Sequence, residues 1–386
     1  MKRHQLTPFL RDIERREIGG LSGGNAVELI IEGSYCFKQF CNEILHARST
    51  INLETYIFRS DDAGWEIARR LADAAKRGVE VNMIYDAIGC IKTSRSIFTY
   101  LKKNGVALIE YNPIEPWRRF FNITFRDHRK ILVIDSRVAF IGGLNIGNEY
   151  SGNLFTNDYQ RDTHVRIEGR AVTDIQFFFI ENCYRCGGRI VEQWKYFPDQ
   201  KKTGNTLLMV LASRAHYNVK PIRVSYLSAI ENARRSIYIE NAYFIPDHRI
   251  LRALSAAVRR GVDVRIMLTR RYVMPFVQHA VRFLYKKYLQ SGIRVFEYTR
   301  TVLHAKTAVI DGIWSTVGSS NIDRLSFWYN LEINAVVLDE DFGTRMNQVF
   351  FEDLDHCEEI TFQSISRRSV LTFLKQWISY RFRNIL

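Results

Sequence analysis

The chain lacks the long apolar runs and the cysteine framework of membrane-spanning and secreted proteins. None of its 386 residues falls in a stretch approaching 18 uncharged apolar residues, so we expect no transmembrane helix. Residues 1–6 (MKRHQL) lead into no apolar segment, so no signal peptide is expected. Of six scattered cysteines, Cys183 and Cys186 form a CxxC pair, and no second ligand pair completes a zinc site. These absences favour reduced thiols in a protein that faces the cytosol.

Acidic residues are scarce relative to basic ones. There are 41 Asp and Glu against 55 Lys and Arg, a net charge of +14. This excess favours an acidic partner, either anionic lipid headgroups or nucleic acid, although a basic surface can also serve solubility alone. The length allows two or three domains. The sequence contains no HExxH motif and no carboxylates clustered at metal-ligand spacing, so we expect neither a metal nor another cofactor.

One motif occurs twice, beginning at His128 and at His304. Counted from each histidine, Lys follows at +2, Asp at +7, Gly at +14 and Asn at +17 in both copies. At ordinary residue usage, four such matches after a given histidine arise by chance with a probability on the order of 10⁻⁵. The two copies therefore indicate a duplication, with these members: His128, Lys130, Asp135, Gly142 and Asn145; His304, Lys306, Asp311, Gly318 and Asn321.

Each copy predicts a β-hairpin that gathers phosphate-binding groups. Residues i and i+2 share one face of a strand, so the histidine and lysine point the same way. Asp311-Gly312 is a strong two-residue turn signal, and Asp135-Ser136 is a weaker one. Lysine supplies charge, while asparagine and the backbone N–H groups of small residues supply directed hydrogen bonds. The imidazole is a potential nucleophile or general acid. Two-residue turns place His128 opposite Gly143 and His304 opposite Ser319.

These residues carry a family resemblance. The chain resembles the phospholipase D superfamily, with two HxK(x)4D motifs, and within it the bacterial cardiolipin synthases of the type without N-terminal membrane spans. The most specific stretches are VGSSNID at 317–323 and NLEIN at 330–334, and the resemblance covers roughly residues 28–340. Many cardiolipin synthases carry N-terminal membrane spans, and this sequence departs from that pattern.

The order of predicted elements repeats along with the motif. The strand at 51–58 matches the one at 237–244, and RGVEV at 77–81 matches RGVDV at 260–264. Order is kept while the offset drifts, as expected of a duplicated domain. We therefore predict an α/β fold of two phospholipase D-like domains, each a mixed sheet flanked by helices. The predicted parts are a loosely held leader (1–24), an N-terminal domain (25–200), and a C-terminal domain with a basic amphipathic tail (205–386).

Neither half makes a complete active site, because one imidazole attacks phosphorus and a second must protonate the departing alkoxide. The resemblance implies that the halves meet about a pseudo-twofold axis, with His128 forming a phosphohistidine and His304 serving as general acid and then base. Which histidine is the nucleophile is not readable from the sequence, and the family habit favours the N-terminal one. Four side chains are expected to hold the non-bridging oxygens: Lys130, Lys306, Asn145 and Asn321.

Acidic residues complete the predicted site. By resemblance, Asp162 and Glu332 hydrogen-bond the motif histidines and fix their tautomers, as the acid of a Ser-His-Asp triad does. The alternative for each is a charge on a surface strand. The catalytic-motif residues Asp135 and Asp311 stand at strand ends, where we assign them to structural hydrogen bonding more than to proton transfer.

The acceptor of the phosphatidyl group decides the function. Water would make the protein a phospholipase or nuclease, whereas a lipid hydroxyl would make it a transferase. The resemblance implies a transferase that joins two phosphatidylglycerols, or related lipids, from a peripheral position on the cytosolic face of the inner membrane. Glu54 and Glu240 are candidates for contacting glycerol hydroxyls or the other domain. A hydrolase of phospholipid or nucleic acid is the alternative. A non-enzymatic binding module is disfavoured, because both halves carry all the expected catalytic residue types.

Three segments are candidates for contact with an anionic phospholipid membrane: 116–121, 273–289 and 367–386. The first is aromatic and basic, and the other two have apolar residues at helical spacing beside basic ones. For 273–289 we expect packing on its own domain. For 367–386, packing and membrane anchoring are evenly balanced. The oligomeric state is not predicted.

Overall fold

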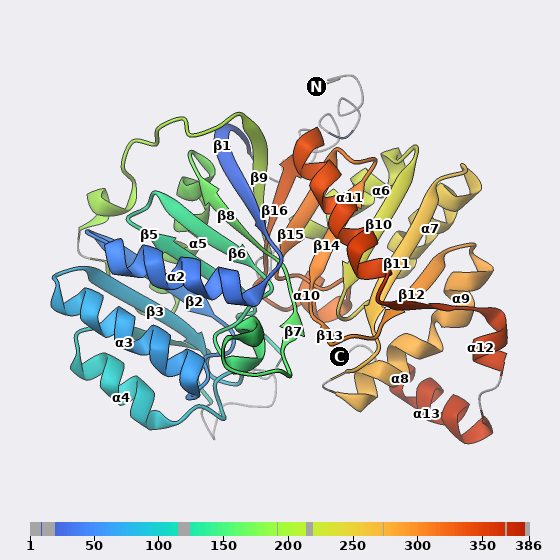
Figure 1. The fold of residues 1–386 in the computed structure, drawn as a ribbon, viewed down its shortest axis with the longest axis horizontal. Helices are drawn as coiled ribbons and strands as arrows, with labels where there is room; N and C mark the ends of the chain where they lie inside the picture. Colours follow the sequence, from blue (N-terminus) through green and yellow to red (C-terminus); the bar gives the residue numbers. More distant parts are fainter. Residues whose placement is uncertain are drawn as a thin grey trace.

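A single 15-stranded mixed sheet runs through the molecule (Figure 1). The computed structural model describes residue 9 and residues 20–114, 124–190, 192–213, 219–272, 274–366 and 369–382. In the first half the strands are β1 (Leu21–Ile30), β2 (Thr50–Thr55), β3 (Glu80–Asp86), β4 (Ala107–Tyr111), β5 (Ile131–Ile134), β6 (Val138–Gly142), β7 (Gln160–Arg161) and β8 (His164–Glu168). Its helices are α2 (Gly33–His46), α3 (Asp62–Lys76), α4 (Arg95–Lys103) and α5 (Ala171–Arg185).

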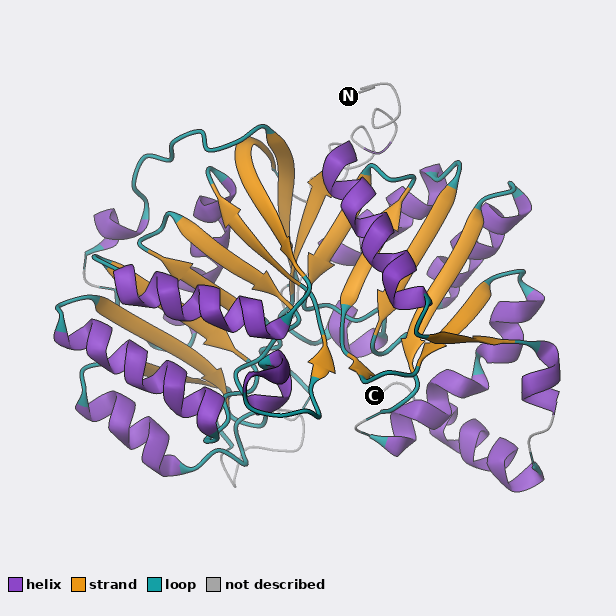
Figure 2. Ribbon diagram, viewed as in Figure 1, coloured by secondary structure: helices purple, strands orange, loops and turns teal. Residues whose placement is uncertain are grey.

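The second half repeats this arrangement with helices on both faces of its sheet (Figure 2). Its strands are β9 (Thr206–Ala212), β10 (Ser236–Asn241), β11 (Asp263–Thr269), β12 (Arg294–Tyr298), β13 (Val302–Leu303), β14 (Lys306–Ile310), β15 (Trp314–Gly318), β16 (Ile333–Leu338) and β17 (Cys357–Ile360). Its helices are α6 (Pro221–Asn232), α7 (His248–Arg259), α8 (Pro275–Phe283), α9 (Tyr285–Gln290), α10 (Arg324–Trp328), α11 (Glu340–Leu354), α12 (Phe362–Ser366) and α13 (Val370–Arg381).

The strand order confirms the predicted duplication. The first half runs β1-β8-β6-β5-β2-β3-β4, and the second runs β9-β16-β15-β14-β10-β11-β12 before ending on β17. β1 and β9 pair antiparallel where the halves meet. Each half combines parallel pairs, such as β2 with β3, and antiparallel pairs, such as β5 with β6. The two halves are thus related by a pseudo-twofold axis at the centre of the sheet.

A shared apolar core fastens the halves together. Val133 and Ile141 of the first half pack in one cluster with Val317 and Ile333 of the second, and all four are fully buried. Fully burying an aliphatic side chain contributes about 1.5–3 kcal/mol, so this cluster strongly favours one arrangement of the halves. We term the boundary between the two halves the seam. The shared core fixes the relative position of the halves at this seam, on which the predicted chemistry depends.

Both motif hairpins form, but the predicted register is wrong by one residue. Ile131 pairs with Ile141 and Thr307 with Val317, so three residues rather than two join the strands. The first two turn residues have positive φ in each hairpin: 51° and 50° at Asp135 and Ser136, 55° and 69° at Asp311 and Gly312. A third residue then precedes the returning strand. The facing pairs His128 with Gly143 and His304 with Ser319 are consequently displaced.

Part of the predicted leader belongs to the sheet. Residues 21–24 open β1, and Gly24 takes φ +85° where the register with β9 shifts. Such a conformation favours glycine, so the Gly-rich run that suggested a loose segment instead permits a bulged strand. Phe9 is buried and meets the Trp314 ring edge-on at 6.2 Å. The other residues of 1–24, apart from Gly20, lie outside the described residues.

The three candidate membrane segments differ in outcome. Residues 116–121 lie outside the described residues. The 273–289 segment forms α8 and α9, with Val277, Val281, Leu284 and Tyr288 buried in the second half's core, which confirms packing on its own domain. The last segment forms α13, considered below. No helix among the described residues is both long and apolar enough to cross a bilayer.

Candidate active site

Each motif histidine is held by a carboxylate from the other half of the chain. His128 Nδ1 lies 3.0 Å from Glu332 Oε2. His304 Nδ1 lies 2.6 Å from Asp162 Oδ2. Both acids predicted to orient a histidine therefore contact one, and the partners are exchanged across the seam. With Nδ1 occupied in both rings, Nε2 is the nitrogen left for chemistry.

Backbone hydrogen bonds across the seam fix these pairs. β13 runs parallel to β7, and the His304 N–H donates to Arg161 O at 2.7 Å (Figure 1). At the other site, the His128 N–H donates to Leu331 O at 3.0 Å. In both pairs, the histidine N–H is bonded to the carbonyl of the residue just before its acid partner: Arg161 precedes Asp162, and Leu331 precedes Glu332. The seam itself builds both pairs, so neither half alone forms them.

The two motif lysines bring positive charge to the same seam. Lys130 Nζ donates to His128 O at 2.7 Å, and Lys306 Nζ donates to His304 O. Burial lowers the pKa of Lys130 to about 7 and that of Lys306 to about 8. Each ammonium also lowers the pKa of the histidine in the opposite half. The histidines, lysines and acids therefore act as one electrostatic cluster.

The two histidine–carboxylate pairs are electrostatically unlike. Burial raises the pKa of Asp162, but the His304 imidazole and the Lys306 ammonium outweigh it and hold that pKa below its usual value. Burial raises the pKa of Glu332 to about 7, against the effect of Lys130. Asp162 is therefore ionised near neutral pH, whereas the pKa of Glu332 lies close to neutral. Burial also lowers the pKa of His304 to about 4 and that of His128 well below 6.5.

Gly143 and Ser319 do not offer their N–H groups to a phosphate, and that prediction is wrong. The Gly143 N–H donates to Thr163 O at 3.0 Å and the Ser319 N–H to Ile333 O at 2.9 Å, because the sheet continues past each hairpin. Both residues instead help to position the acids that orient the histidines. A Cβ at Gly143 would lie 2.1 Å from Asp162 Oδ1. Ser319 Oγ donates to Glu332 Oε2 at 2.5 Å.

The motif asparagines are buried at the ends of the hairpins. Asn145 Oδ1 accepts from the Ile57 N–H at 3.1 Å, which ties the first hairpin to the end of β2. Asn321 Oδ1 has no hydrogen-bond partner among the described residues. An unpaired buried polar atom is costly, so Asn321 is a candidate for contact with substrate.

Asp135 and Asp311 are structural, as their position at strand ends suggested. The Asp135 carboxylate accepts from the N–H groups of Arg48, Ser49 and Thr50 at 2.7–3.2 Å. Asp311 accepts in the same way from the residues that lead into β10: Arg234, Arg235 and Ser236. Seven residues of extended chain span about 23 Å, so neither carboxylate reaches a motif histidine. Their place in the catalytic motif reflects folding of the hairpin.

Glu54 and Glu240 are held by protein side chains, and their contact with glycerol hydroxyls stays a prediction. Glu54 is fully buried, with Oε1 accepting from Asn182 Nδ2 at 3.0 Å and lying 3.7 Å from Arg129 Nη1. Glu240 is 2% exposed and accepts from Thr307 Oγ1 at 3.3 Å. Both stand on strands that have helices over each face (Figure 2), and the sequence alone did not show this burial. Glu240 does interact with the other half of the chain. Burial raises the pKa of Glu240, and the charge of Arg161, in the first half, acts against that rise.

Three site residues were missed by sequence reasoning. The Tyr56 ring meets the His128 ring at 5.0 Å and lies 5.3 Å from Lys130 Nζ. Tyr150 meets the His304 ring at 5.9 Å. Arg161 pairs with Asp353 at 2.6 Å across the seam. Tyr56 could have been found from the sequence, because it lies close to Glu54 in a strand that is matched between the halves. Nothing in the sequence pairs Arg161 with Asp353, which is 192 positions away.

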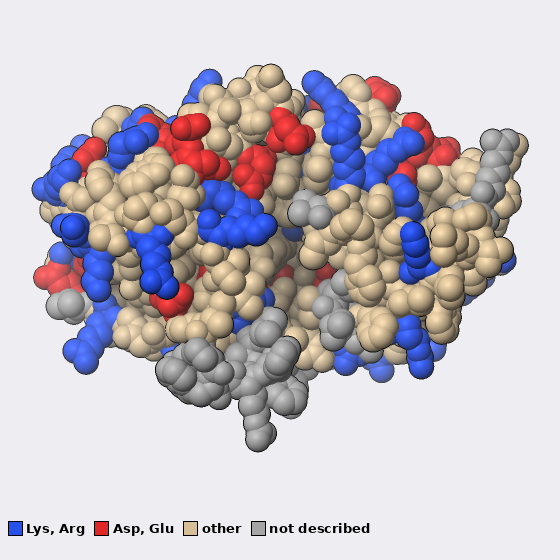
Figure 3. All heavy atoms as spheres, turned by 90° about the horizontal axis from the view of Figure 1, so that it is seen from below, with Lys and Arg blue, Asp and Glu red and all other residues tan. Residues whose placement is uncertain are grey.

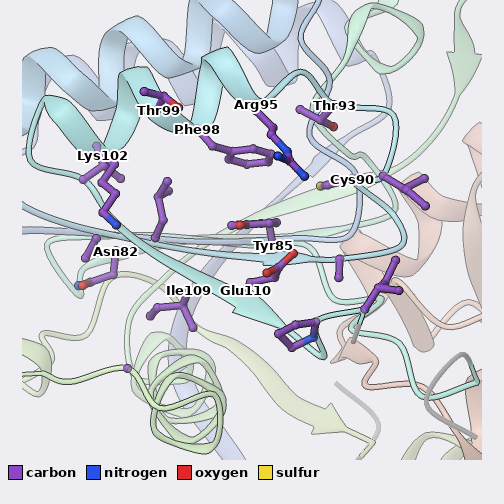
Figure 4. A pocket seen from close by; sticks show the side chains of 18 of the residues that line it. Asn82, Tyr85, Cys90, Thr93, Arg95, Phe98, Thr99, Lys102, Ile109 and Glu110 are labelled. Carbon is purple, nitrogen blue, oxygen red and sulfur yellow. The ribbon is translucent and has the colours of Figure 1, made fainter. Parts of the chain in front are cut away.

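A separate cavity of about 930 Å³ lies between α4 and β4 (Figure 4). Tyr85 and Phe98 stack in it, beside Arg95 and Glu110. None of the predicted site residues lines it, so it is not the catalytic cleft. Cys183 of the CxxC pair is fully buried nearby, and burial raises the pKa of its thiol to about 11, as in a packed structural cysteine.

Fold and site together define the protein class: a duplicated phospholipase D-like α/β protein with one histidine–lysine–carboxylate cluster built by both halves. Residues 40–175 and 226–354 match the family described as cardiolipin synthase, phospholipase D-like domain. The chain is 34% identical over 361 residues to the cardiolipin synthase of Listeria monocytogenes serotype 4a (strain HCC23), covering 93% of this chain and 75% of that one. It is 32% identical over 388 residues to cardiolipin synthase 2 of Staphylococcus epidermidis (strain ATCC 35984), covering 99% and 80%.

The chain belongs to the cardiolipin synthase family, and its enzyme class is that of the phospholipase D-type phosphatidyltransferases. Among solved structures, the phosphatidylserine synthase of Haemophilus influenzae Rd KW20 superposes with a TM-score of 0.75 at 13% identity, covering 98% of this chain and all of that one. This likeness extends the fold assignment to the whole chain.

Proposed function

We propose that the protein joins two phosphatidylglycerols, or a closely related donor and acceptor phospholipid, through a phosphohistidine and releases the donor's alcohol. The observation that supports this most strongly is the exchange of acids across the seam, which makes the two histidines parts of one site. Kinship with cardiolipin synthases supports the lipid substrates.

In the first step, His128 Nε2 attacks the donor's phosphorus and the P–O bond to the headgroup glycerol breaks. His304 gives the Nε2 proton to the departing alkoxide. A nucleophilic imidazole must be neutral, and burial together with Lys130 and Lys306 lowers the pKa of His128. The general acid must carry a proton. Burial lowers the pKa of His304 to about 4, but the Asp162 anion at 2.6 Å and the arriving phosphodiester both act against this by favouring its imidazolium. These opposite demands support His128 as nucleophile and His304 as acid.

In the second step, a hydroxyl of the acceptor lipid attacks the phosphohistidine. His304 takes the hydroxyl proton, the P–N bond to His128 breaks, and both histidines return to their starting states. Lys130 and Lys306 would hold the non-bridging oxygens, and their buried ammonium groups gain strength from the low dielectric around them. Arrival of the anionic phosphodiester also raises the pKa values of the lysines and histidines that face it.

The acceptor distinguishes this proposal from hydrolysis, since water would release phosphatidic acid from the same intermediate. The unpaired Asn321 Oδ1 is an acceptor suited to a substrate hydroxyl, which supports a bound alcohol. For location, we propose a peripheral position on the cytosolic face of the inner membrane, next to anionic lipid. The net charge of +14 and six unpaired cysteines support this position.

Radiolabelled phosphatidylglycerol in vesicles provides the test. We expect a dimeric lipid and free glycerol in equal amounts, and neither with His128→Ala. Phosphatidic acid as the main product would replace the transferase with a lipase. Cleavage of an oligonucleotide, with no change to the lipid, would replace it with a nuclease.

A further inference from the structure

Helix α13 exposes its apolar side chains and buries its polar ones. Its fully buried positions are Gln376 and Ser379. The exposed positions form what we term the apolar face: Val370, Leu371, Phe373, Leu374, Trp377 and Ile378. Their exposed fractions range from 41% to 85%. An amphipathic helix of a globular protein normally has the reverse arrangement, and a contiguous exposed apolar surface marks an interaction site.

The helix is firmly docked, so its orientation is a property of the fold. The Ser369 side chain caps it by accepting from the Thr372 N–H at 3.2 Å. The Tyr380 ring stacks on Phe283 of α8 at 4.8 Å, and Phe382 meets Phe276 at 6.5 Å. Phe373, at one edge of the apolar face, also meets the Phe283 ring at 6.0 Å. With Gln376 and Ser379 buried, these contacts leave most of the apolar face outward.

Exposed cations surround the apolar face. Lys286, Lys287, Lys375 and Arg381 are all exposed, and none forms an ion pair with another described residue. A cavity of about 840 Å³ between α9, α12 and α13 continues the face, with Phe362 and Ile365 in its wall and the two α9 lysines beside them. Apolar side chains beside exposed cations match the interface of an anionic bilayer, where lysine stems lie along lipid and their charges reach headgroups.

The apolar face lies on the side of the molecule where the seam also ends. In Figure 1, α8 and α13 form the lowest part of the right-hand half, and β7 and β13 lie above them at the lower end of the seam. His304 directly follows β13 in the chain. Figure 3 views the molecule from below, and the lower right-hand part of that view is largely uncharged with isolated Lys and Arg side chains. A flat bilayer in contact with α13 would therefore lie across the same side as the active-site seam.

We propose that the apolar face of α13 and the cavity beside it bind an anionic phospholipid bilayer and orient the active-site seam toward its lipids. This rests on the proposed function, since lipid substrates explain why docking and catalysis share one side of the protein. The bilayer accounts for both the apolar residues and the unpaired cations, whereas a second copy of this chain would bring like charges together at the same surface.

The experiment compares two variants of the full chain on vesicles of phosphatidylglycerol and phosphatidylcholine. Leu371→Glu with Leu374→Glu places two charges on the apolar face. Phe177→Glu is the matched control, because Phe177 is 49% exposed on α5 and Leu374 is 48% exposed on α13. We expect the double variant to lose about tenfold or more in vesicle binding and the control to bind as wild type does. Brominated acyl chains should quench wild-type fluorescence, and Trp377→Phe should remove most of that quenching.

Turnover of monomeric short-chain phosphatidylglycerol separates docking from catalysis. The double variant should keep its turnover of monomeric lipid while losing turnover on vesicles. Unchanged vesicle binding by the double variant, or no quenching of Trp377, would overturn the proposal. So would a wild-type dimer that the double variant dissociates while vesicle binding persists, since a second copy would then cover the face. A different outcome separates the two proposals. If the double variant loses vesicle binding but even the wild type transfers no lipid, on vesicles or as monomers, the proposed function is wrong while the docking surface is supported.

Discussion

Replacing Asp162 with Asn tests the exchange of acids most sharply, because it alters one half while the effect should appear in the other. Asn keeps the size of the side chain and removes the charge that faces His304 Nδ1 at 2.6 Å. An opposite charge at such a distance raises a histidine pKa by about 1–3 units. We therefore expect the pKa of His304, already lowered to about 4 by burial, to fall by that amount in the variant.

The same change should slow turnover strongly. An imidazole with the wrong tautomer and no facing anion loses most of its acid–base contribution, which is worth about 10²–10⁴-fold. Carbon-13 NMR of labelled histidines gives each pKa and tautomer, and kcat on monomeric lipid gives the rate. Asp158→Asn is the matched control, since Asp158 is exposed and precedes β7. The reasoning is refuted if His128 shifts instead of His304, or if turnover stays within threefold, as a rough limit, of wild type.

Three further outcomes follow from the same contacts. Gly143→Ala should lower kcat by roughly 10²-fold, because its Cβ would lie 2.1 Å from Asp162 Oδ1, and a normal rate would show that Asp162 can move without harm. Asp311→Ala should cost about 1–2 kcal/mol of unfolding free energy in urea, because it removes the carboxylate that accepts from three N–H groups leading into β10. The folded variant should keep its rate, and a stable but inactive variant would contradict this. Finally, kcat/KM should fall as pH rises through about 7–8, because Lys130 and Lys306 have pKa values of about 7 and about 8 and lose their charge in that range. A flat profile up to pH 9 would show that neither ammonium group is needed.

The duplication and the residues of its two motif hairpins could be predicted because they are local. Fixed offsets from each histidine identified the hairpins, and the matched strands identified two similar sheets. The turn register failed by one residue because Asp135 and Ser136 both adopt positive φ, and a third turn residue follows them. Turn chemistry of this kind depends on the strands around it as much as on the two residues themselves.

The contacts across the seam could not be predicted, because they depend on how the halves meet. The sequence places Asp162 34 residues after His128, yet it serves His304, and Glu332 serves His128 in return. Gly143 and Ser319 were taken for phosphate donors because the extension of the sheet beyond each hairpin was not apparent. Glu54 was considered for substrate contact because it lies in a strand matched between the halves, and the sequence did not show that both faces of that strand are buried.

The central claim is that one site per chain uses both histidines, and trapping the intermediate tests it most directly. Enzyme mixed with labelled phosphatidylglycerol is quenched in denaturant at alkaline pH, and the label is counted and located by mass spectrometry. We predict no more than one phosphatidyl group per chain, carried on His128 and absent from His128→Ala. Two groups per chain, one on each motif histidine, would contradict a shared site.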